Sequence, residues 1–200
     1  DETGAVWAFA ALTGQVVWQT RIKGIPVSPA VGDLDGDGKP EIVVATGDGA
    51  VTALNHRGQV LWERKMGGSS PSWATSAPVI FAGADGRGRV AAASSDGQFF
   101  CLNSKGEVLW RRTTRGAVAS TISVGDLDLD GHADICLITQ VGVIHRFDES
   151  GRVIWEIDMQ GRSLAPGAMI DLDGDGKLEY VLSTQDGFLQ ILNNAGEFLY

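Results

Sequence analysis

A short motif recurs five times along the chain at a nearly constant interval, and this repetition limits the possible folds more than any other feature. Each copy has a glycine, two or three mostly apolar residues and an aromatic residue, at residues 14–18, 58–62, 106–110, 151–155 and 196–200. The aromatic residues follow one another after 44, 48, 45 and 45 positions. Repeats of this length are typical of four-stranded propeller blades or of helical HEAT units.

The content of one repeat decides between these two architectures. Four short β-rich runs alternate with turn residues, at residues 28–33, 41–46, 50–55 and 59–65. No stretch of ten residues keeps an uninterrupted helical period. The second run is continuously apolar, as in a strand that is buried on both faces. The sequence therefore predicts an all-β propeller that is built from four-stranded blades.

The repeats divide the single predicted domain, residues 1–200, into a half blade and four full blades. Their approximate limits are 1–24, 25–68, 69–116, 117–161 and 162–200. The half blade at the start has no complementary half at the end. We therefore expect the chain to be part of a larger propeller, in which further blades or another chain close the ring. A closed ring of four full blades is the alternative.

Three connections between the first and second strands of a blade carry closely spaced acidic residues. We call them the first (residues 33–41), second (126–134) and third (171–179) acidic loops. Each has acids at positions 1, 3, 5 and 9, and position 7 offers its backbone carbonyl. Calcium binds six to eight oxygen ligands, and alternate carboxylates on a turning backbone converge on one point. We predict three Ca²⁺ sites, with the ligands Asp33, Asp35, Asp37, Lys39, Glu41, Asp126, Asp128, Asp130, His132, Asp134, Asp171, Asp173, Asp175, Lys177 and Glu179.

An EF-hand, a magnesium site and a metal-free turn each fit these loops less well than a calcium loop does. An EF-hand needs a glutamate at position 12 and flanking helices, whereas position 12 here is Val44, Leu137 or Leu182 within an apolar run. Magnesium prefers fewer protein ligands and keeps its waters. A solvated acidic turn without an ion would account for one loop, but three copies at equivalent positions favour a metal.

The second full blade departs from this pattern. Its aligned residues at positions 1, 3, 5 and 9 are Phe81, Gly83, Asp85 and Arg89. Only one acid is left, and a cation replaces the last one, so we expect no calcium in this blade. Calcium would then stabilise individual loops rather than form a shared reaction centre.

Two family resemblances rest on these residues. The acidic loops resemble the calcium loops of FG-GAP/VCBS repeats, as in integrin α-subunit propellers. The hairpins between third and fourth strands resemble the tryptophan-docking motif of PQQ-type quinoprotein propellers, which has Ala, then Asp or Asn, Gly at position 7 and Trp at position 11. Ala53, Asn55, Gly58 and Trp62 match it, residues 8–18 lack the acid, and the other three copies are looser. We expect the repeat tryptophans to pack between blades rather than to bind a cofactor.

The quinoprotein resemblance also implies a test for an enzyme. That family uses a vicinal cysteine pair near the quinone, whereas Cys101 and Cys136 lie in separate strand runs and are expected to be small core residues. The three histidines, His56, His132 and His145, share no setting for a triad. We predict that this chain does not catalyse a reaction. The alternative is that it is part of a PQQ-type quinoprotein or of a carbohydrate-active enzyme.

A basic surface is the candidate ligand site. Because strands alternate in direction, the acidic loops lie on one side of the blades and the blade-to-blade connections on the other. Half of the 16 lysines and arginines lie near those connections. The candidate ligand residues are Trp73, Arg111, Arg112 and Arg115. We expect an anionic glycan or an acidic protein surface as the ligand, and solvated loop charge is the equal alternative.

Composition narrows the function further. The net charge of −9 disfavours nucleic-acid binding by a basic domain, and no apolar run is long enough for membrane insertion. Twelve of the 25 acidic residues belong to the acidic loops, so the acidity is local. We predict a calcium-stabilised binding or cell-adhesion module that is extracellular, at the cell surface or periplasmic, where calcium is plentiful. A protein-assembly scaffold is a second alternative.

Overall fold

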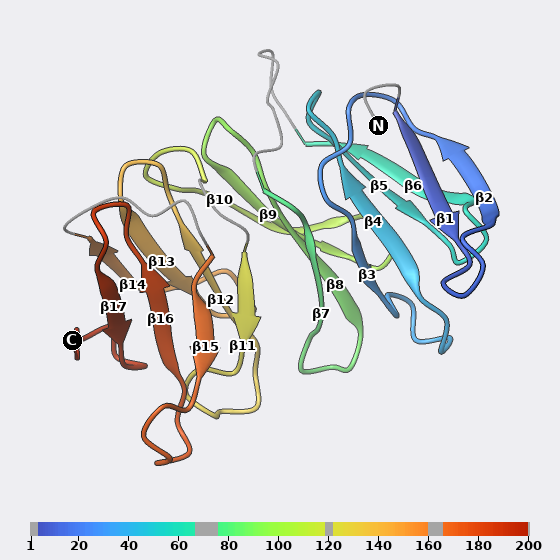
Figure 1. Ribbon diagram of the computed structural model, residues 1–200. Coiled ribbons are helices and arrows are strands. Elements are labelled where there is room, and N and C mark those ends of the chain that lie inside the picture. Colours follow the sequence, from blue (N-terminus) through green and yellow to red (C-terminus); the bar gives the residue numbers. More distant parts are fainter. Residues whose placement is uncertain (1–3, 67–75, 119–121, 160–165, 200) are drawn as a thin grey trace.

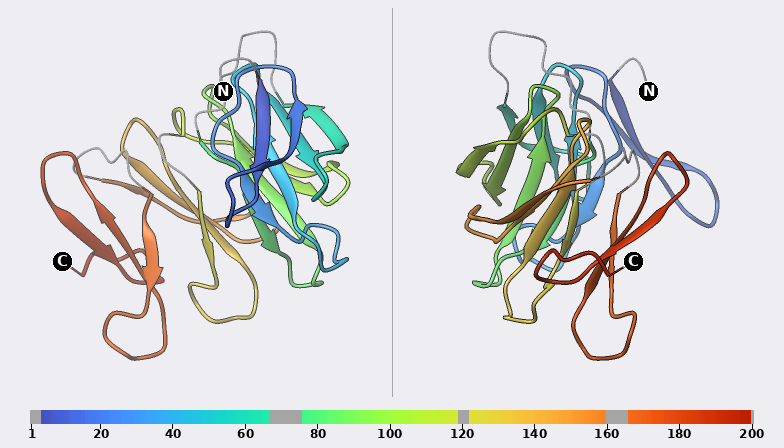
Figure 2. Two further views of the ribbon diagram at one scale, coloured as in Figure 1. Left: turned by 45° about the vertical axis from the view of Figure 1, so that its right-hand side comes forward. Right: turned by 90° about the vertical axis from the view of Figure 1, so that its left-hand side faces the viewer.

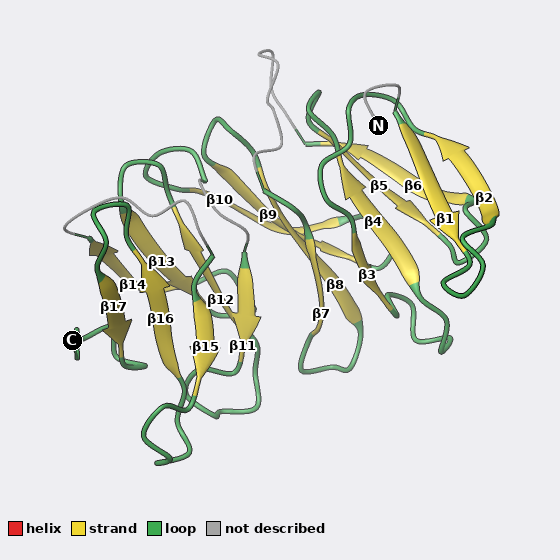
Figure 3. Ribbon diagram, viewed as in Figure 1, coloured by secondary structure: helices red, strands yellow, loops and turns green. Residues whose placement is uncertain are grey.

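The computed structural model describes residues 4–66, 76–118, 122–159 and 166–199, and the structural statements below concern these residues. They form seventeen strands, and none of them belongs to a helix (Figure 3). The described part of the chain accordingly contains no helix that is long and apolar enough to cross a membrane. The prediction of an all-β chain is confirmed.

The strands form five antiparallel sheets, and in each sheet the strands follow one another in chain order. The first sheet consists of β1 (Ala5–Phe9) and β2 (Val16–Arg21). The second consists of β3 (Ala30–Gly32), β4 (Glu41–Ala45), β5 (Ala50–Leu54) and β6 (Val60–Lys65). The third consists of β7 (Val79–Ala82), β8 (Gly88–Ala93), β9 (Gln98–Asn103) and β10 (Val108–Thr113). The fourth consists of β11 (Ser123–Gly125), β12 (Asp134–Ile138), β13 (Val143–Phe147) and β14 (Val153–Asp158). The last consists of β15 (Ala168–Ile170), β16 (Glu179–Ser183) and β17 (Leu189–Leu192).

The sheets follow one another in a row, and the sheets with β1 and with β17 lie at its two ends (Figures 1 and 2). The first strands of consecutive full blades are in contact with each other. For example, Ser123 Oγ on β11 donates a hydrogen bond to the backbone oxygen of Gly167, next to β15, at 2.6 Å. Among the described strands, no pairing joins the first sheet to the last. The structure is therefore a partial, unclosed propeller of four-stranded blades, as predicted.

The last blade differs from the prediction of four strands. Its fourth run contributes an isolated bridge between Leu192 and Phe198 and a hydrogen bond from Leu199 N to Ile191 O at 2.8 Å. In the other blades a tryptophan of this strand docks on the next blade. The corresponding residue here, Tyr200, lies outside the described residues, and the last sheet has three strands.

Hydrophobic residues fill the spaces between neighbouring sheets rather than one central core. Both faces of the middle strands are covered, so that β5 and β13 are buried along their whole length. The layer between the first two full blades joins Val43 and Ala53 to Val90 and Leu102. Similar layers join the next blades, and a smaller one joins β1 and β2 to the first full blade. Stability therefore comes from contacts between neighbouring blades, as in other repeat proteins.

Each of the four repeat tryptophans docks on a turn of the following blade, which confirms their predicted role. The indole nitrogens donate hydrogen bonds to backbone oxygens, from Trp18 to His56 (3.0 Å), Trp62 to Ser104 (2.8 Å), Trp110 to Glu149 (2.9 Å) and Trp155 to Asn194 (3.0 Å). The turn glycine permits this approach, because a Cβ atom on Gly151 would lie only 2.6 Å from the Trp110 ring. The five-residue motif of the sequence is thus the joint between blades.

Candidate metal loops

The three acidic loops project from the same edge of their blades, at the bottom of the view in Figure 1. They connect β3 with β4, β11 with β12, and β15 with β16. The second strand of each blade begins with the acid of position 9, and this residue is buried at the sheet edge in all three loops. The strands therefore fix one end of each loop, and the carboxylates of positions 1, 3 and 5 lie in the turn.

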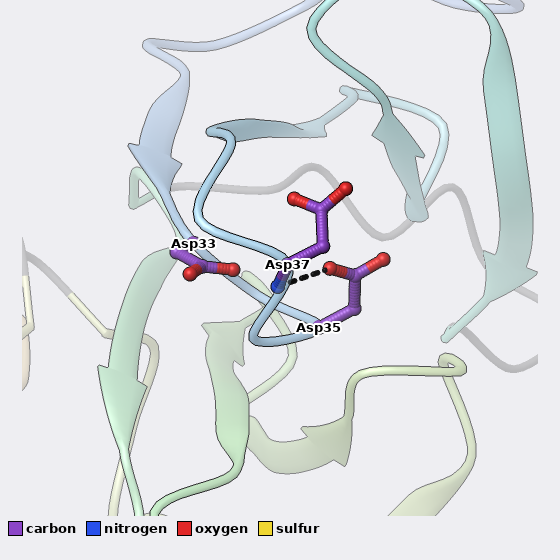
Figure 4. Close-up of side chains that lie close together, drawn as sticks. All are labelled: Asp33, Asp35 and Asp37. Carbon is purple, nitrogen blue, oxygen red and sulfur yellow. Dashed lines mark hydrogen bonds between the residues drawn. The ribbon is translucent and has the colours of Figure 1, made fainter.

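In the first acidic loop, carboxylate oxygens of Asp33, Asp35 and Asp37 lie within 4.8 Å of one another (Figure 4). Asp33 closes the loop, because its Oδ1 accepts a hydrogen bond from Gly36 N at 2.8 Å and its Oδ2 accepts one from Gly38 N at 2.9 Å. Both glycines have positive φ values, 82° and 81°, which other residues rarely adopt. The sequence pattern thus forces three carboxylates to the same side of a tight turn.

The third acidic loop has the same construction. Asp171 accepts hydrogen bonds from Gly174 N at 2.7 Å and from Gly176 N at 3.0 Å. Its cluster of three acids consists of Asp171, Asp173 and Glu179. Position 9 therefore joins the cluster here, whereas the cluster of the first loop is made by positions 1, 3 and 5.

The lysines at position 7 of these two loops make exposed ion pairs. Lys39 Nζ lies 3.0 Å from Asp37 Oδ2, and Lys177 Nζ lies 3.6 Å from Asp175 Oδ2. The hydrogen bond from the Lys39 side chain holds the pKa of the Asp37 carboxyl below its ordinary value. Both lysine side chains are more than half exposed, at 54% and 58%, and such pairs add little stability in water.

The acid of position 9 ties the first and second loops to the blade that follows. It accepts a hydrogen bond from the backbone nitrogen of position 2, from Leu34 to Glu41 (2.9 Å), from Leu127 to Asp134 (2.8 Å) and from Leu172 to Glu179 (2.9 Å). The side chains of Leu34 and Leu127 are 1% and 0% exposed and belong to the layer shared with the next blade. Leu172 in the last blade is 50% exposed. The folding of a loop is thereby coupled to packing between blades.

The second acidic loop contains a buried cation that the sequence analysis missed. Its cluster consists of Asp126, Asp128 and Asp134, and the guanidinium group of Arg146 on β13 contacts two of them. Arg146 Nη2 lies 2.5 Å from Asp128 Oδ2 and 2.7 Å from Asp134 Oδ2, while Nε lies 2.9 Å from Asp134 Oδ1. Burial raises the pKa of the Asp134 carboxyl, and the hydrogen bonds from Arg146 oppose that rise.

Two other residues of the second loop also differ from their counterparts. Leu129 has a φ of 60°, at the position that glycine occupies in the first and third loops. His132, at position 7, has its Nδ1 atom 3.4 Å from Glu149 Oε1. The second loop is therefore the least regular of the three.

The corresponding loop of the second full blade is closed by a basic residue. Arg89 has its guanidinium nitrogens 3.5 Å from Asp85 Oδ1 and 3.7 Å from Glu149 Oε2. Ala84 N donates a hydrogen bond to the same Glu149 oxygen at 2.8 Å. A carboxylate of the following blade thus holds this loop, and sequence spacing carries no signal for a contact across 65 residues.

The residues that were expected to bind an anionic ligand lie in different settings. Arg112 lies in β10, and its Nε donates a hydrogen bond to Gly151 O in the next blade at 2.5 Å, so it is part of the joint between blades. Arg111 is exposed and donates to Gln98 Oε1 at 2.7 Å. Arg115 is exposed and lies 3.0 Å from Asp158 Oδ2. Trp73 lies outside the described residues.

The potentially reactive side chains are dispersed. Cys101 and Cys136 are buried in different layers, and burial raises the pKa of both thiols, that of Cys101 to about 12. His145 is 2% exposed, and burial lowers its pKa although Glu156 Oε2 lies 3.2 Å from its Nδ1 atom. The cysteines are thus core residues, as predicted, and a thiol with a raised pKa is a poor nucleophile at neutral pH.

Two protein-family models match parts of the chain. The model of the lambda-carrageenase β-propeller domain matches residues 3–75, and that of the outer membrane protein assembly factor BamB matches residues 47–129. These matches support the predicted PQQ-like propeller repeats, while the FG-GAP/VCBS resemblance stays a prediction. No curated protein matches the sequence.

Many solved structures share the fold. BamB from Moraxella catarrhalis is 17% identical with a TM-score of 0.71, and the match covers 100% of this chain and 59% of BamB. Sqt1 from Saccharomyces cerevisiae is 16% identical with a TM-score of 0.77, and the match covers 100% of this chain and 56% of Sqt1. The quinohemoprotein alcohol dehydrogenase from Comamonas testosteroni is 16% identical with a TM-score of 0.69, covering 99% of this chain and 40% of the enzyme. The chain thus spans at most about three fifths of these proteins, and identities this low show the fold alone.

Proposed function

We propose that the chain is the calcium-stabilised part of a β-propeller that binds a partner and does not catalyse a reaction. The observation that carries this proposal is the convergence of three carboxylates within 4.8 Å in the first and third acidic loops. The donors are all oxygens, as calcium requires, and they come from one short turn that β-strands anchor at both ends. Carboxylates so close together repel one another strongly unless a cation lies between them.

The first prediction concerns calcium binding. Isothermal titration of the metal-free protein with calcium is expected to show binding at the first and third loops, that is, two equivalents. Asp35→Ala and Asp173→Ala each remove one exposed carboxylate and are expected to abolish one equivalent each. Asp85→Ala in the loop of the second full blade is the matched control, and it should leave both equivalents in place. Heats no larger than those of dilution in the unaltered protein would refute the calcium proposal.

We further propose an anionic glycan as the ligand. The support is the match of residues 3–75 to a propeller domain of lambda-carrageenase, because carrageenan is a sulfated polysaccharide. Two exposed arginines are available, Arg111 on β10 and Arg115 in the connection that follows β10. Arg115 is balanced by Asp158, so a glycan sulfate would have to displace this acid from a surface ion pair, which costs little.

The second prediction tests this ligand. Lambda-carrageenan on a biosensor surface is expected to retain the protein, and binding should weaken at high salt because the contacts are ionic. Charge reversal of Arg111→Glu together with Arg115→Glu is expected to reduce binding at least tenfold. Arg152→Glu is the control, because Arg152 is also exposed but lies at the turn before β14, on the side of the acidic loops. Equal retention of all three proteins would exclude this surface.

A protein-assembly scaffold is the second candidate function. The match of residues 47–129 to the model of an outer membrane protein assembly factor favours it. The same match supports a location outside the cytoplasm, where millimolar calcium would fill loops of modest affinity. In the carrageenan experiment this candidate predicts no retention, together with unchanged calcium binding.

We propose no catalytic role for the described residues. The support is their chemistry: the two thiols are buried with raised pKa values, and His145 is enclosed in a blade. The clustered acidic residues lie in the acidic loops, where we propose that they bind calcium. A PQQ-type or carbohydrate-active enzyme that contains this propeller would therefore need its reactive groups from other parts of the protein.

A further inference from the structure

Arg146 is the one basic residue that lies buried within an acidic loop cluster of the described chain. Its side chain is 3% exposed, whereas Lys39 and Lys177 of the other two loops are more than half exposed. All three of its polar nitrogens donate hydrogen bonds, to Asp134, to Asp128 and to Asn194 O. A buried guanidinium that makes four hydrogen bonds in this way is held in one place.

The residue is specific to this blade. Strand register shows the equivalence, since Arg146 pairs with Cys136 as Ala53 pairs with Val43 and Ile191 with Val181. The blades with the first and third acidic loops therefore have an apolar side chain at this place, and their clusters contain no buried cation from the described residues. The second loop has both the cluster of acids and its own counter-charge.

Arg146 also contacts the turn of the next blade, at a different carbonyl oxygen from the one used in the other blades. In the three other blades with a docking tryptophan, the residue two positions after it donates to the glycine carbonyl of the next turn, as Arg64 Nε does to Gly106 O at 2.9 Å. The residue at this position of β14 is Ile157, which cannot donate. Instead Arg146 Nη1 donates to Asn194 O at 2.6 Å, the same oxygen that accepts the Trp155 indole hydrogen bond.

We propose that Arg146 is the resident cation of the second acidic loop, so that this loop is metal-free and is held by the protein itself, while calcium binds the first and third loops. The inference rests on the proposed calcium function. It changes the three sites expected from the sequence to two. The physical reason is that Asp128 and Asp134 already share a guanidinium, and a calcium ion at the cluster would have to displace a buried arginine from both.

The third prediction tests this directly in a protein that keeps Arg146. In the double variant Asp35→Ala/Asp173→Ala, the first and third loops each lack one ligand and the second loop is unchanged. Calcium titration of this variant is expected to show no binding, and terbium luminescence should fall to the background. One remaining equivalent of calcium would overturn the inference. If the unaltered protein bound no calcium at all, the proposed calcium function would fail instead, so the two failures are distinguishable.

The converse variant is Arg146→Ala, which copies Ala53 of the first blade. Removing the guanidinium frees Asp128 and Asp134, which lie in one cluster with Asp126, and the calcium stoichiometry is expected to rise from two to three. We expect this variant to melt at a lower temperature than the unaltered protein without calcium and to recover with it. A stoichiometry of two in a folded variant would contradict the inference. Should the variant fail to fold even with calcium, the double variant above still decides the question, because it leaves Arg146 in place.

Discussion

Replacing Trp110 by alanine is expected to lower the free energy of unfolding by about 3–5 kcal/mol, the usual range when a large aromatic residue is removed from a core. The ring is 9% exposed and belongs to the layer between two full blades. It lies edge-on to Phe99, with ring centres 5.1 Å apart, and 6.3 Å from Phe147 of the next blade. The substitution also leaves the carbonyl oxygen of Glu149 without its indole donor. Chemical denaturation followed by far-ultraviolet circular dichroism, which does not depend on the missing indole, measures the loss.

Trp7 provides the matched control for this substitution. It is 42% exposed and stacks on Phe9 in the first sheet, with ring centres 6.2 Å apart. Trp7→Ala removes the same side chain without opening a joint between blades, so its cost should be much smaller. Similar losses for the two variants would show that the joint is not what makes Trp110 important.

The variants Gly151→Ala and Gly14→Ala separate the effect of the docking contact on stability from the effect of backbone strain. Gly151 and Gly14 occupy the same motif position and both have positive φ values, 79° and 66°. A Cβ atom on Gly151 would lie 2.6 Å from the Trp110 ring, whereas one on Gly14 would meet nothing within 4 Å. Alanine therefore introduces similar strain at both, and the extra loss of stability at Gly151 measures the close approach of the tryptophan.

The sequence predicts the fold well because the fold is local and repeated. A blade is a meander of neighbouring strands, so turns and apolar runs within about 45 residues define it. The tryptophan of one motif docks on the glycine turn of the next motif, in the following blade, and the repeat itself indicates that these joints are equivalent. The acidic loops are also local, since Asp33 reaches Gly36 and Gly38 within the same turn.

The placements of Arg146 and Arg112 could not be predicted from the sequence, because they depend on strand register and on contacts between blades. Arg146 on β13 reaches Asp134 on the neighbouring strand β12. In the sequence this contact is indicated only by an arginine at the motif position that is alanine in the first two copies. This arginine is the one charged residue at a position that is apolar in the other four copies of the motif. Arg112 was grouped with the surface charges because it follows a tryptophan near a connection, whereas its guanidinium lies against the next blade. Neither placement can be derived without knowing which strands pair.

The net charge of −9 comes largely from the acidic loops, and these loops also affect stability. Acidic residues at positions 1, 3 and 5 are exposed in the first and third loops, and position 9 accepts a hydrogen bond from the backbone nitrogen of the leucine at position 2. In the first loop this leucine, Leu34, packs between two blades. A cation that draws the carboxylates together therefore also fixes the segment that carries Leu34. In the second loop Arg146 has this effect permanently, so we expect the junction of the last two blades to be insensitive to calcium.

Removal of calcium is accordingly expected to have the second large effect. A ligand that binds only the folded state at a hundred times its Kd adds about 2.7 kcal/mol, so two filled loops add about 5 kcal/mol. For a chain of 200 residues this corresponds to a fall in Tm of about 10–20 °C when EDTA is added. Differential scanning calorimetry in calcium and in EDTA measures it, with magnesium as the comparison ion. In the Asp35→Ala/Asp173→Ala variant the two traces should coincide, because neither loop can fill. A shift of the same size in that variant would mean that the stabilising ion binds elsewhere, and no shift in the unaltered protein would mean that the acidic loops hold their shape without a metal.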